Sequence, residues 1–179
     1  WGTALSIVLA ENGHDTLLWT NRVDQEKEIN EQHTNVQYIG NKKLPENLKA
    51  TTDLSEAVNH GDTIVVAVPT KAIREVCGNL NNVLLTEKLF VHVSKGIEPD
   101  SLLRISEIIK ETVSPELLSD IVVLSGPSHA EEVVLQHPTT VSAACVNLQA
   151  AEKVQDLFMN HYFRVYTNDD VLGVEIGGA

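Results

Sequence analysis

The sequence of 179 residues has few of the side chains on which several functions depend. Its two cysteines, Cys77 and Cys145, stand far apart in apolar surroundings and lack metal-ligand spacing. We therefore expect two buried, reduced thiols, which suits a cytoplasmic protein. No apolar run approaches the about 20 residues that span a bilayer, so no membrane partner is expected.

Positive charge is also scarce, because 13 lysines and arginines face 25 aspartates and glutamates and the net charge is −12. Nucleic acid and anionic membranes are therefore excluded as general partners, and an anion can bind only at a local positive site. The seven histidines include no pair with metal-ligand spacing, so no metal site is expected. The 42% of hydrophobic residues is enough for one sizeable core.

The beginning of the chain lacks both an initiator Met and a strand before its first amphipathic helix. That helix is expected to end at Gly13 and to feed a short strand over residues 15–20. A helix followed by a buried strand is the second half of a β-α-β unit. We therefore expect the first strand to be missing and Gly2 to be the last glycine of a G-x-G-x-x-G turn.

Strand-like apolar runs then alternate with helical patterns. Strands are expected at residues 63–69, 89–94, 120–124, 140–146 and 163–167, with helices at 71–85, 101–113, 129–136 and 148–160. This alternation predicts an α/β fold with a doubly wound, mostly parallel sheet. The segment 30–50 is expected to be a loop insertion. Residues 1–168 would form one domain, and 169–179 would begin a further helix.

Two predictions concern helix starts. Asp53 and Glu56 resemble a capping box that opens a short helix, which Gly61 then ends. The helix 101–113 is expected to be capped by Asp100 or Ser101 and to bury Leu102.

In such a sheet, ligands bind at the carboxyl ends of the strands. At the start of the first helix, Trp1 and Gly2 would present backbone amides to a pyrophosphate, although simple helix entry explains them as well. After the next strand, Asn21 is uncharged and Arg22 follows, which favours the 2′-phosphate of NADP(H) over the ribose of NAD(H). The alternative is a solvated surface arginine.

Two consecutive later strands end in residues suited to an anion. Lys95 follows one strand, and Gly126 and Ser128 follow the next, where backbone amides can approach a ligand closely. Each turn alone could be a plain strand-to-helix connection, but the pair favours a binding site. His129 could touch the ligand, whereas His92 is expected in the core.

These residues lie in four runs that resemble the bacterial NAD(P)-dependent glycerol-3-phosphate dehydrogenases: WGTALSIVLAENGHDTLLW, VSKGIEPDS, LSGPSHAEEV and FRVYTNDDVLGVEIGGA. The resemblance covers essentially the whole chain. It implies a Rossmann-like domain that binds NAD(P)H, with the family's all-helical C-terminal domain absent from this chain. The implied reaction is reversible reduction of dihydroxyacetone phosphate to sn-glycerol 3-phosphate, for phospholipid synthesis in the cytoplasm, by a possible homodimer.

The resemblance also implies roles for single residues. Lys95 would be catalytic, shared between cofactor and substrate, and would stabilise the oxyanion or hold the substrate. Substrate contacts are implied for Gly126 and Ser128, and cofactor contacts for Trp1, Gly2, Asn21, Arg22, Lys95 and Ala130.

Two departures from the family matter. The family's proton acceptor is a lysine in a G-G-A-x-K-N run and would lie beyond Ala179, so this chain alone is expected to be inactive. The family also usually carries a bulky residue, often Phe, where His129 stands.

Two other readings stay open. One is another reductase of the same architecture, such as a ketopantoate reductase or a 2-hydroxy-acid dehydrogenase. The other is a nucleotide-binding module without chemistry. In any of these, loss of the first strand would leave two unpaired strand edges, unless residues upstream or another strand fill the gap.

Overall fold

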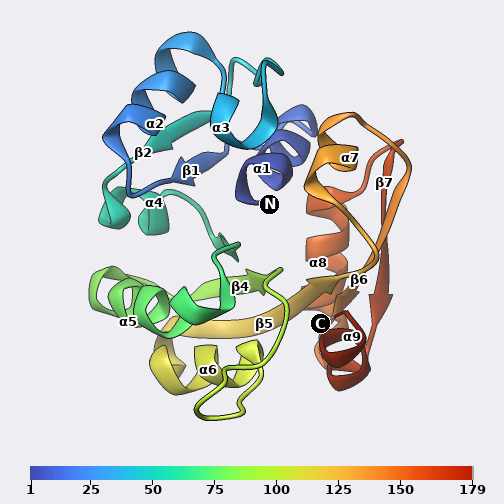
Figure 1. Cartoon of the computed structure of the whole chain (residues 1–179). Coiled ribbons are helices and arrows are strands. Elements are labelled where there is room, and N and C mark those ends of the chain that lie inside the picture. The colour runs from blue at the N-terminus through green and yellow to red at the C-terminus, as the bar shows by residue number, and fades with distance from the viewer. Residues whose placement is uncertain (179) are drawn as a thin grey trace.

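The computed structural model describes residues 1–178 and has the predicted α/β architecture (Figure 1). A five-stranded sheet runs in the order β3 (Thr63–Val66), β4 (Lys88–His92), β5 (Leu118–Ser125), β6 (Thr139–Ala144) and β7 (Phe163–Asn168). Only the pair β5–β6 is antiparallel among these strands, so the sheet is mostly parallel. A separate parallel pair joins β1 (Leu17–Trp19) and β2 (Lys49–Thr51). The doubly wound, mostly parallel fold is thus confirmed.

Helices connect these strands. Those of at least seven residues are α1 (Gly2–Glu11), α4 (Leu54–His60), α5 (Ile73–Val83), α6 (Ile105–Thr112), α8 (Leu148–Phe158) and α9 (Val171–Gly177). Shorter ones are α2 (Val23–Lys27), α3 (Val36–Ile39) and α7 (Ala130–Val134), with a π-helical turn at Glu28–Gln32 and 3₁₀ turns at Thr70–Ala72 and Pro115–Leu117. No helix within residues 1–178 is long and apolar enough to cross a membrane.

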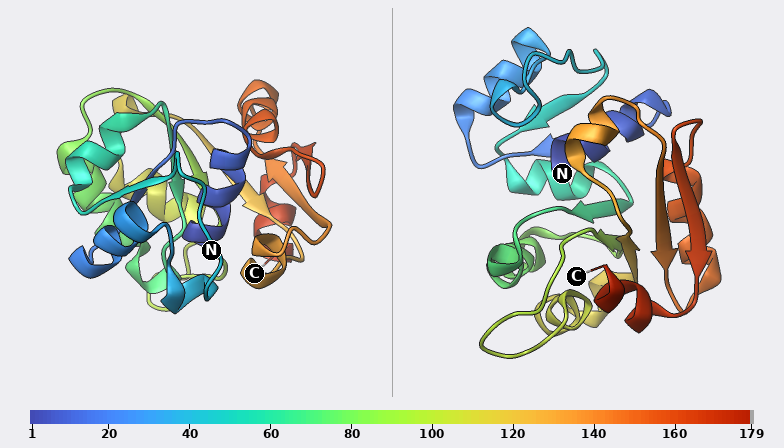
Figure 2. Two further views of the ribbon diagram at one scale, coloured as in Figure 1. Left: turned by 90° about the horizontal axis from the view of Figure 1, so that it is seen from above. Right: turned by 45° about the vertical axis from the view of Figure 1, so that its right-hand side comes forward.

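Two hydrophobic cores lie on opposite faces of the sheet, because side chains alternate along each strand. In β4, Leu89 and Val91 pack into the core that α1, α7 and α8 cover. Phe90, between them, packs into the core formed with α4, α5 and α6. The views in Figure 2 show these helix layers, and they place both chain ends on one side of the molecule.

The sheet is interrupted between β1 and β3. Within residues 1–178, β1 pairs with β2 and β3 pairs with β4, and no strand lies between β1 and β3. A cavity of about 460 Å³ separates these two edges and is lined mostly by apolar side chains of α1, β1, α4 and β3. The sequence predicted two unpaired edges here, and no other described strand fills the gap.

The segment 30–50 differs from the predicted loop insertion. It contains α3 and the start of β2, whose Lys49, Ala50 and Thr51 pair with Leu17, Leu18 and Trp19 of β1. The strand escaped prediction because three residues are too few to show an alternating pattern.

The start of α6 also differs from the prediction. The helix begins at Ile105, and Arg104 occupies its N-cap position in place of Asp100 or Ser101. Leu102 has a left-handed backbone (φ 59°) and is 75% exposed, so it does not join the core. The preceding loop closes on itself instead, since the Leu102 amide donates to the carbonyl of Glu98.

At the start of α4, the predicted cap by Asp53 is present, but the predicted return contact from Glu56 is not. The Asp53 carboxylate accepts the amides of Ser55 and Glu56, and Gly61 follows the last helical residue. The Glu56 carboxylate accepts the hydroxyl of Thr51 instead of an amide of the cap.

Candidate functional site

The predicted residues at the ends of β4 and β5 meet at one place. These strands are parallel neighbours, with His92 opposite Val123, so Lys95 and Gly126 extend beyond them side by side. The Lys95 ammonium donates to the Gly126 carbonyl at 3.1 Å, and the Ser128 hydroxyl donates to the same oxygen at 3.3 Å. The register of the sheet thus brings together two turns that lie 31 residues apart.

Four of the predicted site residues line one narrow crevice at these strand ends. Trp1, Lys95, Gly126 and Ser128 form part of its wall. The rest of the lining comes from Leu5, Val93, Leu124, Ser125, Val141 and Phe163. An exposed ammonium and a partly buried hydroxyl therefore stand beside apolar side chains at a crevice of about 10 Å³.

Gly126 is required by close packing against the neighbouring strand. A β-carbon at this position would lie 2.8 Å from the Thr140 carbonyl oxygen and 2.9 Å from the Val141 α-carbon, both backbone atoms of β6. We expected the glycine to permit close approach of a ligand. The structure adds a second reason, since any larger residue would push β6 away from the turn.

The N-terminus of α1 is open to an anion. Trp1 occupies the N-cap position without a side-chain cap, and the first turn contains no acidic residue. The first intrahelical hydrogen bond runs from the Leu5 amide to the Trp1 carbonyl, so the amides of residues 2–4 have no partner within the helix. A β-carbon on Gly2 would meet Ala67 at 3.7 Å and Leu18 at 3.8 Å, which are ordinary contacts. Close helix–strand packing is therefore not what requires glycine here.

Asn21 and Arg22 lie apart from this crevice, directly after β1. Asn21 is exposed, and Arg22 is the N-cap residue of α2. The Arg22 guanidinium is held by Asp24, with Nε 3.1 Å from Oδ1, and also contacts the Gln37 side chain. The hydrogen bonds that Arg22 donates to Asp24, and the negative charge of Asp24, raise the pKa of Arg22. An incoming phosphate would therefore have to compete with Asp24.

Ala130 and His129 stand at the start of α7. His129 is the exposed N-cap residue and makes no side-chain cap, while Ala130 packs against the core on the α1 side of the sheet. Neither belongs to the described lining of the crevice.

Sequence reasoning missed the side chains that fasten β3 to the turn after β4. The Ser94 hydroxyl donates to the Val68 carbonyl at 2.6 Å, and the Thr70 hydroxyl donates to the Lys95 carbonyl. The sequence does show hydroxyl residues just after these two neighbouring strands, and this pattern could have indicated the contacts. These bonds join the segments that follow β3 and β4 beyond the last paired residues, and they hold the backbone of Lys95 in place.

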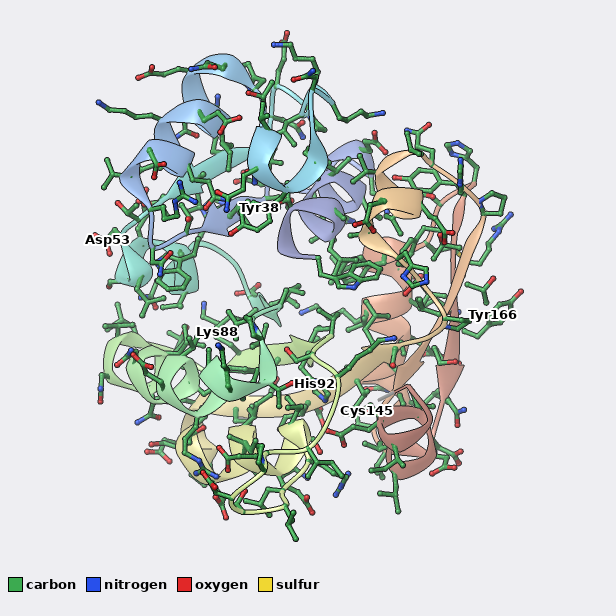
Figure 3. The ribbon with its side chains drawn as sticks, in the orientation of Figure 1. Tyr38, Asp53, Lys88, His92, Cys145 and Tyr166 are labelled. Atoms are coloured by element: carbon green, nitrogen blue, oxygen red, sulfur yellow. The ribbon has the colours of Figure 1, made fainter. Side chains whose placement is uncertain are left out.

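A second missed feature is a buried carboxylate near the site. Glu175 of α9 is 5% exposed and contacts His92, Arg104 and Ser106. His92, labelled in Figure 3, is 1% exposed, as its predicted place in the core requires.

Both cysteines are buried free thiols as expected, and burial raises the pKa of Cys77 to about 11.

Known proteins resemble this chain over its whole length. Residues 1–151 match the family described as the NAD-dependent glycerol-3-phosphate dehydrogenase N-terminus. All 179 residues align at 68% identity with glycerol-3-phosphate dehydrogenase [NAD(P)+] of Lysinibacillus sphaericus, and at 59% identity with that of Bacillus subtilis. The chain spans about half the length of these relatives, 53% and 52% respectively.

A solved structure supports the same assignment. The crystal structure of glycerol-3-phosphate dehydrogenase from Coxiella burnetii superimposes with a TM-score of 0.89 at 34% identity, over 99% of this chain and 54% of that one. The resemblance seen in the sequence is thereby confirmed. The chain belongs to the family of NAD-dependent glycerol-3-phosphate dehydrogenase N-terminal domains.

Proposed function

We propose that the protein carrying this chain is an NAD(P)H-dependent glycerol-3-phosphate dehydrogenase that interconverts dihydroxyacetone phosphate and sn-glycerol 3-phosphate. The observation that carries the proposal is the meeting of Lys95, Gly126 and Ser128 with Trp1 around one crevice at the strand ends. A cofactor-binding helix terminus and a cation for an anionic substrate thus share one edge of the sheet.

The residues present fit a dinucleotide. The uncapped amides at the start of α1 suit a pyrophosphate, and the helix dipole adds favourable charge there. Trp1 would cover the cofactor next to the crevice, and Ala130 would contact it from the start of α7. When bound, the cofactor supplies or accepts the hydride at the carbonyl carbon.

Lys95 would act on the substrate oxygen. Its exposed ammonium has three N–H donors and gives one of them to the Gly126 carbonyl, so two can reach the substrate. They would stabilise the negative charge that develops on the carbonyl oxygen. The Ser128 hydroxyl and the backbone at Gly126 would hold the glycerol phosphate. By resemblance to the family, a lysine beyond Ala179 would carry the proton.

The preferred cofactor in this proposal is NADP(H), with NAD(H) also accepted. The position after β1 is the uncharged Asn21, and Arg22 offers a planar guanidinium to a 2′-phosphate. Asp24 opposes this preference by pairing with Arg22. A 2′-phosphate, with more charge than one carboxylate, would displace it.

The family resemblance also supports separate roles for two parts of the protein. Residues 1–168, which end with β7, would form the cofactor domain, and α9 would lead from residue 169 onward toward the part that completes the substrate pocket. The chain alone would then be inactive. The resemblance further supports a homodimer, a cytoplasmic location and a role in phospholipid synthesis. The two free buried thiols suit the cytoplasmic location.

The test is a substrate panel with the intact protein. We expect NADPH oxidation with dihydroxyacetone phosphate, and formation of sn-glycerol 3-phosphate in equal amount. Ketopantoate and 2-oxo acids, which lack the phosphate that Ser128 and the backbone at Gly126 would bind, should give no turnover above background. Turnover with one of those acids alone would overturn the proposal. Cofactor binding without any turnover would favour a non-catalytic module.

A further inference from the structure

A buried carboxylate joins helix α9 to the sheet behind the strand-end crevice. We propose that Glu175 is a positioning residue, which holds the end of α9 against the crevice wall and so sets the geometry of the reacting groups. This inference rests on the proposed function for its effect on turnover, whereas its structural part is independent of any activity.

Four groups, three at the start of α6 and one in β4, surround the Glu175 carboxylate. Oε1 accepts the Ser106 amide at 2.9 Å, and Oε2 accepts the Ser106 hydroxyl at 2.8 Å. The Arg104 guanidinium donates to Oε2 at 2.8 Å, and the Nε2 atom of His92 lies 3.4 Å from Oε1. Helix α9 is thereby fastened both to the start of α6 and to β4.

The Glu175 carboxylate adds an acceptor at the start of α6, where the Glu107 carboxylate already accepts the Arg104 amide at 2.9 Å. Arg104 at the N-cap position makes no side-chain bond that satisfies the Ser106 amide, and Glu175 of a distant helix accepts that amide instead. A negative charge at the N-terminus of a helix is favoured by the helix dipole. The contact therefore fixes α9 to α6 in one relative position.

The charge is kept despite burial. Burial by itself would raise the pKa of Glu175, but the nearby His92 ring and the hydrogen bonds that Ser106 donates outweigh it and lower the pKa to about 2. A charged carboxylate that lost its partners would be left in an apolar interior at high cost. Undocking of α9 is disfavoured because it would leave the Ser106 amide and the Arg104 guanidinium without their acceptor.

The C-terminal end of this helix touches the candidate site. Gly178 follows Glu175 by three residues, so both lie toward the same face of the helix. A β-carbon on Gly178 would lie 1.9 Å from the Ser125 hydroxyl oxygen, which means that the helix end rests directly on Ser125. Ser125 lines the crevice with Lys95 and Gly126. Glu175 therefore controls how closely α9 approaches that wall.

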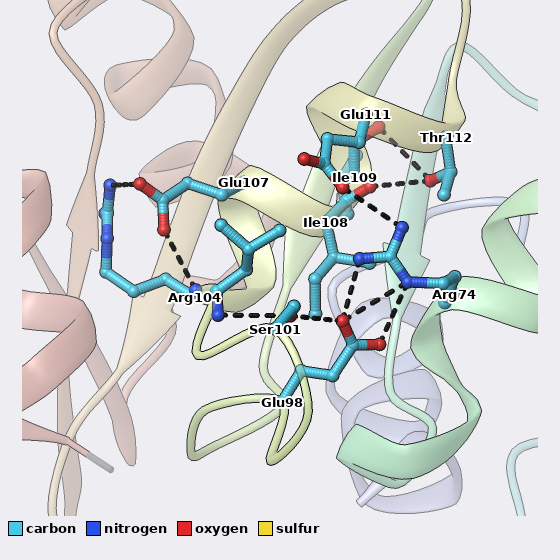
Figure 4. Close-up of polar contacts among 10 residues, drawn as sticks. Arg74, Glu98, Ser101, Arg104, Glu107, Ile108, Ile109, Glu111 and Thr112 are labelled. Carbon is cyan, nitrogen blue, oxygen red and sulfur yellow. Dashed lines mark hydrogen bonds and ion pairs between the residues drawn. The ribbon is translucent and has the colours of Figure 1, made fainter.

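The experiment compares three variants of the intact protein. Glu175→Ala removes the anchor, and Glu175→Gln keeps oxygen acceptance from Ser106 but loses the charge. The matched control is Glu107→Gln, because Glu107 pairs with the same Arg104 (Figure 4) at 2.9 Å on the surface of α6. The measurements are amide hydrogen exchange of α9, the dissociation constant of NADPH, and kcat and KM for dihydroxyacetone phosphate.

We expect Glu175→Ala to speed exchange in α9 by at least about tenfold and to lower kcat by about tenfold to a hundredfold, as a displacement of about 1 Å can do. NADPH affinity should change by less than about twofold, and Glu107→Gln should match the wild type. If Glu175→Ala does not fold, Glu175→Gln should show the same changes at smaller size.

Three results would overturn the inference: unchanged exchange in α9, an unchanged kcat with faster exchange, or an equal loss in Glu107→Gln. A wild-type protein without turnover would contradict the proposed function instead, and the exchange measurement would still test the anchoring by Glu175.

Discussion

The Lys95 ammonium and the Gly126 carbonyl oxygen, 3.1 Å apart, join the turns that follow β4 and β5. The bond holds a flexible, exposed side chain at the mouth of the crevice while leaving two of its donors free for a ligand. Because the partner is a backbone atom, substitution of a neighbouring side chain cannot remove it. Lys95 is therefore positioned by the register of the sheet.

Replacing Lys95 by Met should abolish most turnover of the intact protein without unfolding it. The aliphatic stem is retained, but the donors for the substrate oxygen are lost, and removal of such a donor costs about 10²–10³ in kcat. Steady-state kinetics with dihydroxyacetone phosphate measures the loss. Lys71→Met, at an exposed lysine of the turn Thr70–Ala72, is the control and should keep full activity. Equal activity of both variants would remove Lys95 from the mechanism.

Two glycine substitutions should change stability in opposite directions. Gly126→Ala places a β-carbon 2.8 Å from the Thr140 carbonyl oxygen and should lower the free energy of unfolding by about 1–3 kcal/mol. Gly78→Ala lies inside α5 with nothing within 4 Å and should raise it by about 0.5–1 kcal/mol. Urea denaturation measures both. A Gly126→Ala variant as stable as the wild type would contradict the close contact with β6.

Cofactor preference should depend on the pair Arg22 and Asp24. Arg22→Ala should weaken NADPH binding by at least about tenfold, since a charged hydrogen bond contributes about 1.5–3 kcal/mol, and should leave NADH binding within about twofold. Asp24→Asn should strengthen NADPH binding, because the competing carboxylate is gone. Fluorescence titration of the intact protein gives both dissociation constants. Parallel changes for NADPH and NADH would show that neither residue reads the 2′-phosphate.

Acid stability should depend on Glu175. Its pKa is about 2 in the folded protein against 4.5 for an ordinary Glu, so its contribution is complete above pH 4.5 and is lost as the pH falls toward 2. The depressed pKa corresponds to a loss on the order of 3 kcal/mol across that range. The groups that face the carboxylate are His92, Arg104 and Ser106.

Urea unfolding at several pH values between 5 and 2 would measure this loss. The Glu175→Gln variant cannot titrate at this position, so its stability should fall less steeply with acid than that of the wild type. Identical pH profiles of stability for the wild type and Glu175→Gln would mean that Glu175 does not contribute to the acid dependence of stability.

Much of the strand-end site could be predicted from the sequence. Lys95 and Gly126 follow strands that are neighbours both along the chain and in the sheet, so their meeting needs only the rule for parallel strands. For Gly126, the sequence predicted close approach of a ligand but did not reveal its close contact with a neighbouring strand. Its close neighbour in the structure is the backbone of β6, and that antiparallel strand packs against the turn in a way no local pattern records.

The rest of the site depends on contacts between distant segments. Glu175 looks like a solvated helix residue in the sequence, and only the packing of α9 on α6 buries it. Leu102 has the spacing of a core residue, but the loop that Glu98 holds turns it outward. Asp24 reads as an acidic residue at a helix start, and its pairing with Arg22 required the structure.

The measurement that tests the central claim most directly is NADPH oxidation by the intact protein with dihydroxyacetone phosphate, for the wild type and Lys95→Met side by side. The account predicts steady turnover with stoichiometric sn-glycerol 3-phosphate for the wild type, and a rate at least about a hundredfold lower for the variant at unchanged NADPH affinity. A wild-type protein that binds NADPH but leaves dihydroxyacetone phosphate unreduced, or a fully active Lys95→Met, would contradict it.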